Sequence, residues 1–395
     1  MRRLATIVIL VGLVAIGFLA RDKIADLFRK DTQDYYKTAC LIWNPGGVTY
    51  FPSAEEAAQH DVISVDASRV FDHELPESYL DSLSMHNPDI IVLLYVTVNS
   101  VYKWQLDNQD ELTLWNRAWV TALGDYLAPA VTCGPCEYFP GAYLLDVTKP
   151  AARTRMVELI GTFMFMHSRP NLGLFLDYFS SAIYSSNQPD IDLDGVPMNQ
   201  DPGEIREWTL AERELARMLR ERLPNTILIG NGNMSRGDDE LQAYLDGCMI
   251  EGAGLYGYGD EPIITFFTGG EFLSIEATKA RFSSRIIDPL ILMDYKYAEP
   301  WAVLIAQMGG VCGVVSPPGP GRGWAPPDPY FDLGKPLGGY QWLNRELNSN
   351  IGTILLNNTG LTRKFEKGEL VLTLNRGGWD NPDGPFTWAI EGRKE

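Results

Sequence analysis

The chain has 395 residues, of which 45% are hydrophobic and 11% aromatic, and its formal net charge is -18. This length and apolar content suffice for a large core. The strong negative charge repels phosphate backbones and excludes nucleic acid as a partner. Such a surface suits a neutral or cationic substrate better than an anionic one.

The N-terminus carries an uncharged run from Leu4 to Ala20 after two arginines. A run of about 17 residues is near the lower limit for a helix that spans a membrane. Phe18 is a poor residue upstream of a cut after Ala20, so the pattern favours an uncleaved anchor over a cleaved signal peptide. We therefore predict an anchor and stem over residues 1–30. The rest of the chain would lie outside the cytoplasm, held at the membrane, or secreted if the segment is cleaved.

Short apolar segments rich in β-branched residues alternate with helical patterns through the middle of the chain. Such alternation is typical of parallel strands joined by crossover helices, and nearly continuous apolar strands indicate burial on both faces. Eight such segments predict a (β/α)8 TIM barrel, an α/β fold, over residues 31–350. The predicted strands are 39–44, 61–68, 90–98, 173–179, 226–233, 247–254, 289–296 and 310–317.

The main alternative is a doubly wound open sheet, which usually carries a glycine-rich phosphate turn after its first strand. The segment WNPGGVTYF (43–51) has no such motif, so we expect no bound nucleotide.

Several helices are predicted between and after these strands. The pattern indicates helices at 148–168, with Pro150 near its start, at 209–223, with Thr209 as an available N-cap, and at 299–310. A further helix is expected around 338–350. Beyond it, turns at 357–360 and 366–369 indicate β-hairpins and predict a C-terminal β appendix over 351–395.

Two of the predicted strands end in a carboxylate. Asp177 ends the fourth strand and Glu251 the sixth, each inside an apolar segment. A buried carboxylate is costly unless it is paired or used in chemistry, and either acid alone would be read most simply as a hydrogen-bonded rim residue. Catalytic residues of TIM barrels lie at these strand ends, where strands four and six are close neighbours. Two carboxylates without a nearby histidine suit glycosidic-bond hydrolysis, so we predict Asp177 and Glu251 as the catalytic pair.

Further side chains near the strand ends are candidates for substrate binding. The apolar surroundings of Glu251 favour it as the general acid/base, because a dry site raises a carboxyl pKa. Asp66, Asn233 and Asp294 are expected to position the sugar, and strand five also offers Asn231. Aromatic rings can stack on the apolar faces of sugars; the aromatic candidates are Trp43, Tyr95, Tyr178 and Trp324.

The segment DIDLDGVPMNQD (190–201) has the spacing of a calcium-binding loop. Acids occupy positions 1, 3, 5 and 12, and glycine occupies position 6, but the last acid is Asp where Glu is usual. The alternative is an acidic surface loop with Asx turns. The reaction itself requires no cofactor. A structural calcium ion would be held by Asp190, Asp192, Asp194 and Asp201.

Cys133 and Cys136 form the sequence CGPC, a spacing shared with thiol oxidoreductases. In those proteins the first cysteine opens a helix directly after a strand. Here EYFPGAY follows and shows no helical pattern. A local disulfide or two free thiols in a loop is therefore the simpler interpretation.

Several segments resemble a glycoside-hydrolase family of (β/α)8 barrels and, more distantly, the endo-α-1,4-polygalactosaminidases. They are DVISVDAS, AYLLDVTKPAARTRMVELI, GLFLDYF, GCMIEG and RKFEKGELVLTLN. The resemblance implies that Asp177 and Glu251 are the catalytic pair and that the substrate is a polysaccharide, amino-sugar polymers included. The CGPC insert and the long loop after strand four depart from the family pattern and leave the choice of sugar open. Two other functions remain, a barrel that binds glycans without cleaving them and a thiol oxidoreductase.

Overall fold

A computed structural model describes the parts of the chain that carry most of these predictions. The described residues are 37–42, 52–73, 75–132, 134–181, 188–231 and 238–251, together with the strands 290–293, 311–315, 341–343, 347–348, 353–354, 360–365, 368–374 and 386–391. The predicted membrane anchor at 1–30 and the predicted helix at 299–310 lie outside them.

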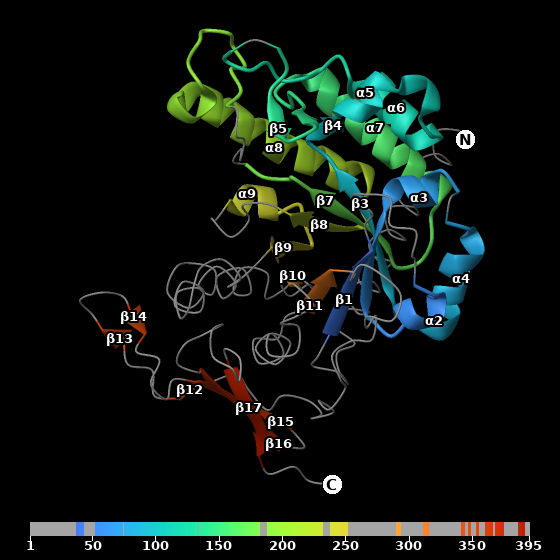
Figure 1. Ribbon diagram of the computed structural model, residues 1–395, viewed down its shortest axis with the longest axis vertical. Helices are drawn as coiled ribbons and strands as arrows, with labels where there is room; N and C mark the ends of the chain where they lie inside the picture. The colour runs from blue at the N-terminus through green and yellow to red at the C-terminus, as the bar shows by residue number, and fades with distance from the viewer. Residues whose placement is uncertain are drawn as a thin grey trace, which may run out of the picture.

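Eight parallel strands close into a barrel (Figure 1). Every neighbouring pair is parallel, and the spatial order follows the chain order around the barrel. Each strand overlaps one of the eight apolar segments, so the strand prediction is confirmed. The strands are β1 (Lys37–Ile42), β2 (Val62–Asp66), β3 (Ile91–Thr97), β7 (Leu172–Asp177), β8 (Ile227–Asn231), β9 (Gly247–Glu251), β10 (Leu290–Met293) and β11 (Val311–Val315).

Burial of both faces explains why these strands read as continuous apolar runs. All six residues of β7 and all five of β8 are buried. Gly173 on β7 is required by close packing, because a Cβ there would come within 2.8 Å of the Ile227 carbonyl oxygen and of Leu93 Cδ2. The barrel therefore leaves no room for a larger side chain at this point.

Helices follow the strands and pack on the outside of the barrel. Figure 1 shows the two longest, α7 (Pro150–Met166) and α8 (Pro202–Arg222), side by side. Proline stands at the start of both, where its missing N–H costs nothing. The shorter helices are α2 (Ala54–Ala57), α3 (Ala67–Phe71), α4 (Glu77–His86), α5 (Lys103–Asp107), α6 (Leu114–Leu123) and α9 (Asp239–Gln242).

The prediction for α8 was wrong at its start. The helix begins at Pro202, and its N-cap is Asp201, whose side chain accepts hydrogen bonds from the N–H groups of Gly203 and Glu204. Thr209 lies inside the helix and is not its cap. Its hydroxyl donates to the carbonyl of Ile205 at 2.9 Å, as threonine often does within a helix.

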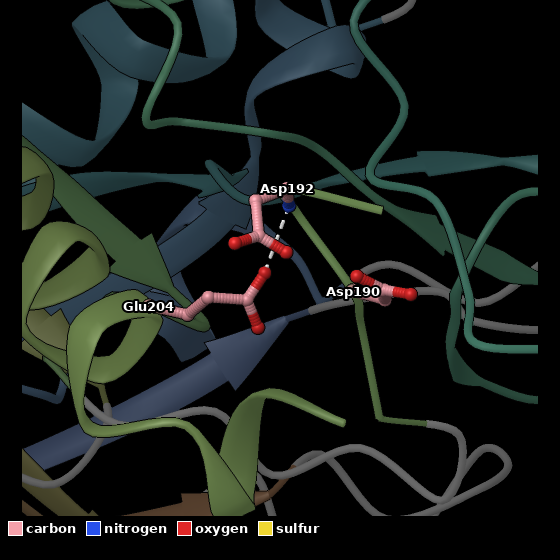
Figure 2. A group of neighbouring side chains, drawn as sticks. All are labelled: Asp190, Asp192 and Glu204. Carbon is pink, nitrogen blue, oxygen red and sulfur yellow. Dashed lines mark hydrogen bonds between the residues drawn. The ribbon is translucent and has the colours of Figure 1, made fainter. Parts of the chain in front are cut away.

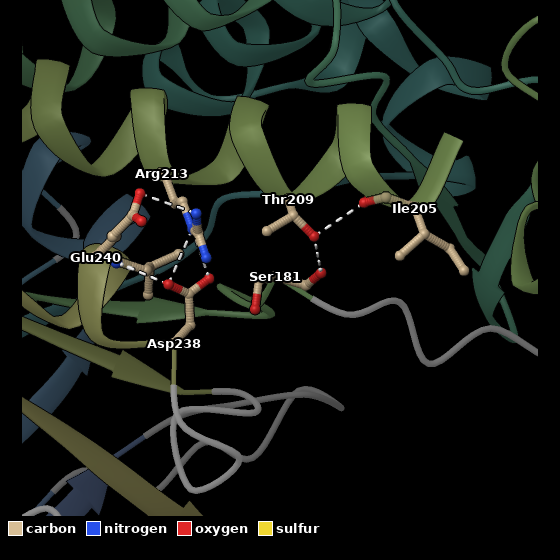
Figure 3. Close-up of polar contacts among 7 residues, drawn as sticks. Ser181, Ile205, Thr209, Arg213, Asp238 and Glu240 are labelled. Atoms are coloured by element: carbon tan, nitrogen blue, oxygen red, sulfur yellow. Dashed lines mark hydrogen bonds and ion pairs between the residues drawn. The ribbon is translucent and has the colours of Figure 1, made fainter. Parts of the chain in front are cut away.

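Helix α8 also holds two of the loops that leave the strand ends (Figure 3). The Thr209 hydroxyl donates to the carbonyl of Ser181 at 3.2 Å, just after β7. The Arg213 Nε lies 2.9 and 3.0 Å from the carboxylate oxygens of Asp238, just before α9. Helix α8 thus contacts the chain just after β7, at Ser181, and just before α9, at Asp238.

An insertion separates β3 from α7. It contains β4 (Ser100–Tyr102), α5, α6, β5 (Glu137–Phe139) and β6 (Ala142–Leu144), and its strands form a sheet in the order β4-β6-β5. The Trp119 indole donates to the Ser100 carbonyl at 3.1 Å and joins α6 to β4. The sequence CGPC therefore lies before a β-hairpin, as the absence of a helical pattern indicates.

A separate antiparallel sheet forms near the C-terminus. Its order is β12 (Gln341–Leu343), β15 (Gly360–Phe365), β16 (Gly368–Leu374) and β17 (Phe386–Glu391). The hairpin predicted at 366–369 is confirmed by the pairing of β15 with β16.

One prediction for the C-terminal region was wrong. The segment expected to be helical around 338–350 contributes β12 and β13 (Leu347–Asn348), because residues such as Trp342 pair with β15 and this pairing overrides local propensity. The strand β14 (Thr353–Ile354) pairs with β13, and most of the turn predicted at 357–360 lies outside the described residues.

Among the helices that the structure describes, none combines the length and the apolar character needed to cross a membrane.

Candidate active site

Asp177 is the buried acid at the end of β7. It is 3% exposed, and its two carboxylate oxygens accept hydrogen bonds from different neighbouring strands. The Tyr95 hydroxyl on β3 donates to Oδ2, and the Asn231 amide on β8 donates to Oδ1 at 2.7 Å. Burial of a carboxylate is tolerated when its oxygens are satisfied in this way. Asp177 is therefore held in a fixed orientation by the strands on both sides of it.

The stagger of the barrel decides which residues share one level. The paired residues can be followed from strand to strand once around the barrel, from Asp177 through Met249, Leu290 and Lys37 back to β7. The path ends on β7 at a position eight residues before Asp177. This is the shear of a (β/α)8 barrel. Each step to the next strand along the chain thus drops by one residue relative to the barrel axis.

Glu251 consequently stands level with Asp177. Asn231, which follows the Leu176–Gly230 pair, is in register with Asp177 and pairs with Met249, two residues before Glu251 on β9. From β7 to β9 is a step of two strands, with β8 between them, and the level drops by one residue at each step. Position 251, two residues beyond Met249, is therefore level with Asp177. By the same count Asp66 on β2 and position 315 on β11 share this level. Alternate strands of a TIM barrel supply one layer of the interior in this manner, and this layer has three acidic positions.

Tyr95 and Asn231 belong to the intervening strands and stand one residue below this layer, where both can donate upward to Asp177. The Tyr95 ring stacks on Phe175 with the ring centroids 5.7 Å apart. Burial raises the pKa of Tyr95 well above its ordinary value, and the charge of Asp177 raises it further. Tyr95 is thus kept protonated as a hydrogen-bond donor.

Two acids of the same layer also affect the pKa of Tyr102 on β4. Burial, followed by the negative charges of Asp177 and Asp66, raises the pKa of Tyr102 to about 12. The Tyr102 phenol therefore favours its protonated form near these two acids.

A buried polar network lies behind Asp177. Asn99, just after β3, donates to the Tyr178 carbonyl at 2.7 Å and to the Glu212 carboxyl on α8. Glu212 is fully buried, and this burial raises its pKa well above its ordinary value, which favours the protonated acid. The network fixes the residue next to Asp177 against the outer helix.

Asp66 and Tyr178, two of the predicted sugar-binding residues, lie near the site and also make contacts that stabilise the fold. Asp66 is the N-cap of α3, and its Oδ1 accepts from the Ser68 N–H at 2.8 Å and the Ser68 hydroxyl at 2.6 Å. Tyr178 has φ of 57°, a left-handed conformation that is uncommon for a side chain of this size. Its ring meets Tyr138 edge-on, with the centroids 4.6 Å apart.

The barrel and its acidic layer can be compared with known proteins. A model of the hypothetical glycosyl hydrolase family 15 matches residues 85–308, more than half of the chain. The chain belongs to this family. The match spans both Asp177 and Glu251, and it confirms the predicted relation to glycoside hydrolases. No curated protein matches the sequence.

Solved structures similar to this family 15 member include other glycoside hydrolases. The glycoside hydrolase domain of PelA from Pseudomonas aeruginosa is 13% identical over 71% of this chain and 94% of that chain, with a TM-score of 0.47. The maltogenic α-amylase AmyB from Thermotoga neapolitana is 9% identical over 87% of this chain and 86% of that chain, with a TM-score of 0.48. The assignment rests on the family model, because TM-scores at this level add nothing to it.

Several predicted site residues of the family 15 member lie outside the described residues: Trp43, Asn233, Asp294, Trp324 and Cys133. Asn231, which the sequence also offered at the end of strand five, is the asparagine that contacts Asp177. The alternation of side chains along a strand does not distinguish Asn231 from Asn233, and it is the register of β8 with β7 that sets Asn231 beside Asp177. Asn99 is visible in the sequence as a polar residue just beyond the third strand, but its pairing with Glu212 depends on how α8 packs.

The remaining predicted residues form two further features. The aspartates of the predicted calcium loop lie close together, with Glu204 of α8 beside them. Cys136 is fully buried, with its sulfur 3.9 Å from the Glu137 carbonyl oxygen, and β5 rather than a helix follows it. A buried thiol before a strand lacks the exposure and helix N-terminus that activate oxidoreductase cysteines.

A surface pocket of about 520 Å³ lies at the other end of the barrel, where its lining includes Leu172 and Ile227 at the starts of β7 and β8. In TIM barrels this end serves stability and the opposite end carries the chemistry. The candidate active site is therefore the acidic layer.

Proposed function

We propose that this glycoside hydrolase family member cleaves glycosidic bonds of a polysaccharide with the carboxyl groups of Asp177 and Glu251. The observation that carries the proposal is the position of these two residues at one level of the barrel, on alternate strands, with Asp177 oriented by Tyr95 and Asn231. At a strand spacing of about 4.8 Å, such positions have Cα atoms roughly 10 Å apart, a separation that two carboxyl groups acting on one glycosidic bond can span.

The two acids would divide the work. Tyr95 and Asn231 are neutral donors that stabilise negative charge on Asp177, which suits a nucleophile or a base that activates water. Glu251, at the end of an apolar strand, would donate its proton to the leaving oxygen as the glycosidic C–O bond breaks. In a retaining reaction Asp177 would attack the anomeric carbon and water would later release the sugar; in an inverting reaction Asp177 would deprotonate the attacking water.

The substrate would be a neutral or cationic polymer, amino-sugar polymers included, because the chain carries a formal charge of -18. Tyr178, Trp43 and Trp324 would supply stacking surfaces for sugar rings. Asn233 and Asp294 would position hydroxyl groups. The uncharged run at Leu4–Ala20 would hold the enzyme at a membrane with the barrel outside the cytoplasm.

The test compares the wild type with Asp177→Asn and Glu251→Gln on a panel of polysaccharides, with new reducing ends as the readout. Asp146→Asn is the matched control, because Asp146 is equally buried but accepts from the Thr148 N–H at 3.0 Å in the turn before α7. We expect cleavage by the wild type and the control and about a thousandfold loss or more in the other two variants. Circular dichroism and thermal unfolding show whether each variant is folded.

Two results would contradict the proposal. If a folded Asp177→Asn or Glu251→Gln enzyme cleaved the polymer as fast as the wild type, the pair would be misassigned. If no polymer were cleaved but one bound equally to all variants, the barrel would be a glycan-binding module. Where cleavage occurs, the anomer released, followed by NMR, decides between retention and inversion.

A further inference from the structure

The loop between β7 and α8 gathers carboxylates in two overlapping groups. Ligand oxygens of Asp190, Asp192 and Glu204 lie within 4.8 Å of one another, and so do those of Asp192, Asp194 and Asp201. The linear calcium-loop pattern covers only the four aspartates. Glu204 belongs to the first turn of α8 and lies beyond the twelve positions of that pattern.

Glu204 distinguishes the first group from the second. Two acids of the first group, Asp190 and Glu204, are each only 3% exposed, whereas Asp192, which both groups share, and Asp194 are exposed. The Glu204 Oε1 accepts from the backbone N–H groups of Ile191 at 2.5 Å and Asp192 at 2.9 Å. Its second oxygen, Oε2, is buried and has no hydrogen-bond partner among the described residues. A buried carboxylate oxygen without a partner is costly unless a ligand occupies the space in front of it.

Figure 2 shows the Glu204 side chain reaching from α8 toward the loop, with its carboxyl group facing Asp192 and Asp190. Three carboxylates brought together in this way repel one another unless a cation lies between them. The closeness of the three carboxylates and the unpartnered Glu204 oxygen therefore both indicate a bound cation.

The loop backbone is shaped as a cation-binding turn requires. The two carboxylate oxygens of Asp190 accept from the N–H groups of Asp194 at 3.1 Å and Gly195 at 2.9 Å. Gly195, the sixth residue of the loop, has φ of +86°, which is the sharp turn that glycine provides at this position of calcium loops.

Asp201 has a different task. Its Oδ1 caps α8 by accepting from the N–H groups of Gly203 at 2.6 Å and Glu204 at 3.2 Å. The acid that the linear pattern places last in the calcium set is thus engaged by the helix terminus, while Glu204 one turn later reaches the buried aspartate.

We infer that a calcium ion binds between the carboxylates of Asp190, Asp192 and Glu204, and that Glu204 replaces Asp201 as the ligand from the helix. Calcium fits because each of these side chains offers oxygen and because Ca²⁺ accepts six to eight oxygen ligands in flexible geometry. Mg²⁺ demands a smaller and more regular octahedron, and zinc prefers nitrogen and sulfur ligands.

The ion would stiffen the segment that connects the active site to α8. Asp190 N–H donates to the Pro129 carbonyl at 3.0 Å, and Met198 N–H donates to the Pro189 carbonyl at 2.8 Å, so the loop joins the insertion, its own start and the helix. Calcium bound to Glu204 would fasten these contacts to α8. This inference does not depend on the proposed hydrolysis, because its readout is stability.

The test measures thermal unfolding of the full chain in excess Ca²⁺ and in EDTA. A ligand at about 100 times its Kd raises the unfolding temperature of a chain of this size by about 3–5 °C. We expect this rise in the wild type and its loss in Glu204→Gln and in the exposed variant Asp192→Asn. Asp201→Asn, the matched control, keeps an acceptor for the helix cap and should show the wild-type rise. Excess Mg²⁺ should produce less than half of it.

The outcomes separate clearly. A wild type that is unaffected by Ca²⁺ would overturn the site, and an equal effect of Mg²⁺ would overturn the choice of ion. A rise that survives in Glu204→Gln but disappears in Asp201→Asn would restore the linear pattern and refute the role of Glu204. If Glu204→Gln does not fold in EDTA, Asp194→Asn decides, because Asp194 is exposed and belongs only to the group of the linear pattern. A rise that survives in Asp194→Asn supports the proposed ligand set, and its loss there would contradict it.

Discussion

The protonated Glu212 gives the molecule a stability that falls as the pH rises. Glu212 is fully buried on α8, and burial raises its pKa well above the ordinary value despite the hydrogen bond from Asn99. In the unfolded chain the same group ionises with a pKa of about 4.3. Between this value and the raised pKa of the folded state, unfolding releases a proton.

The sign and size of the effect follow from this proton release. Because the folded state binds more protons than the unfolded state, the free energy of unfolding falls by about 1.4 kcal/mol for each pH unit in that interval. Glu212→Gln removes the titrating group but keeps an oxygen that can accept from Asn99. We therefore expect the wild type to lose stability relative to the variant as the pH rises from about 5 toward the raised pKa of the folded state.

Urea unfolding of both proteins at several values between about pH 5 and pH 7 measures the two slopes. Glu214→Gln is the matched control on the same helix, because pairing with Arg217 lowers the pKa of Glu214. The stability that Glu214 provides is complete above its unfolded pKa and is lost only as the pH falls through its folded value, so the control should keep the wild-type slope in this range. Parallel slopes for Glu212→Gln and the wild type would refute a protonated Glu212.

Two further changes test the site and the barrel that carries it. Tyr95→Phe removes the hydroxyl that donates to Asp177, while the ring keeps its stacking on Phe175. We expect the variant to have a kcat/KM on the cleaved polymer that is lower by about tenfold or more. An unchanged kcat/KM would mean that this hydrogen bond does not matter in the transition state. Gly173→Ala puts a Cβ within 2.8 Å of the Ile227 carbonyl and should lower the free energy of unfolding by about 1–3 kcal/mol in urea titrations, whereas an unchanged midpoint would show that the strands separate without cost.

The local sequence pattern was sufficient to predict the strands of the barrel and the buried acid Asp177 at the end of one of them. Strands buried on both faces must be apolar along their whole length, so a single acid at the end of β7 is visible in the letters alone. The partners of that acid were not visible to the same degree. Asn231 and Asn233 look alike in sequence, and the register of β7 with β8 sets Asn231 beside Asp177.

Only the tertiary structure could reveal the residues whose role depends on packing between distant elements. Glu212 belongs to a helix rich in charges and reads as a surface residue, yet α8 turns it toward Asn99, which is 113 positions away. Glu204 lies outside any linear calcium pattern and meets Asp190 because α8 begins earlier than its apolar periodicity indicated. The segment at 341–343 joins a sheet because its partner strand β15 is present. Sequence pattern records which faces a segment buries, whereas contacts across the fold depend on the angle and register at which those faces meet.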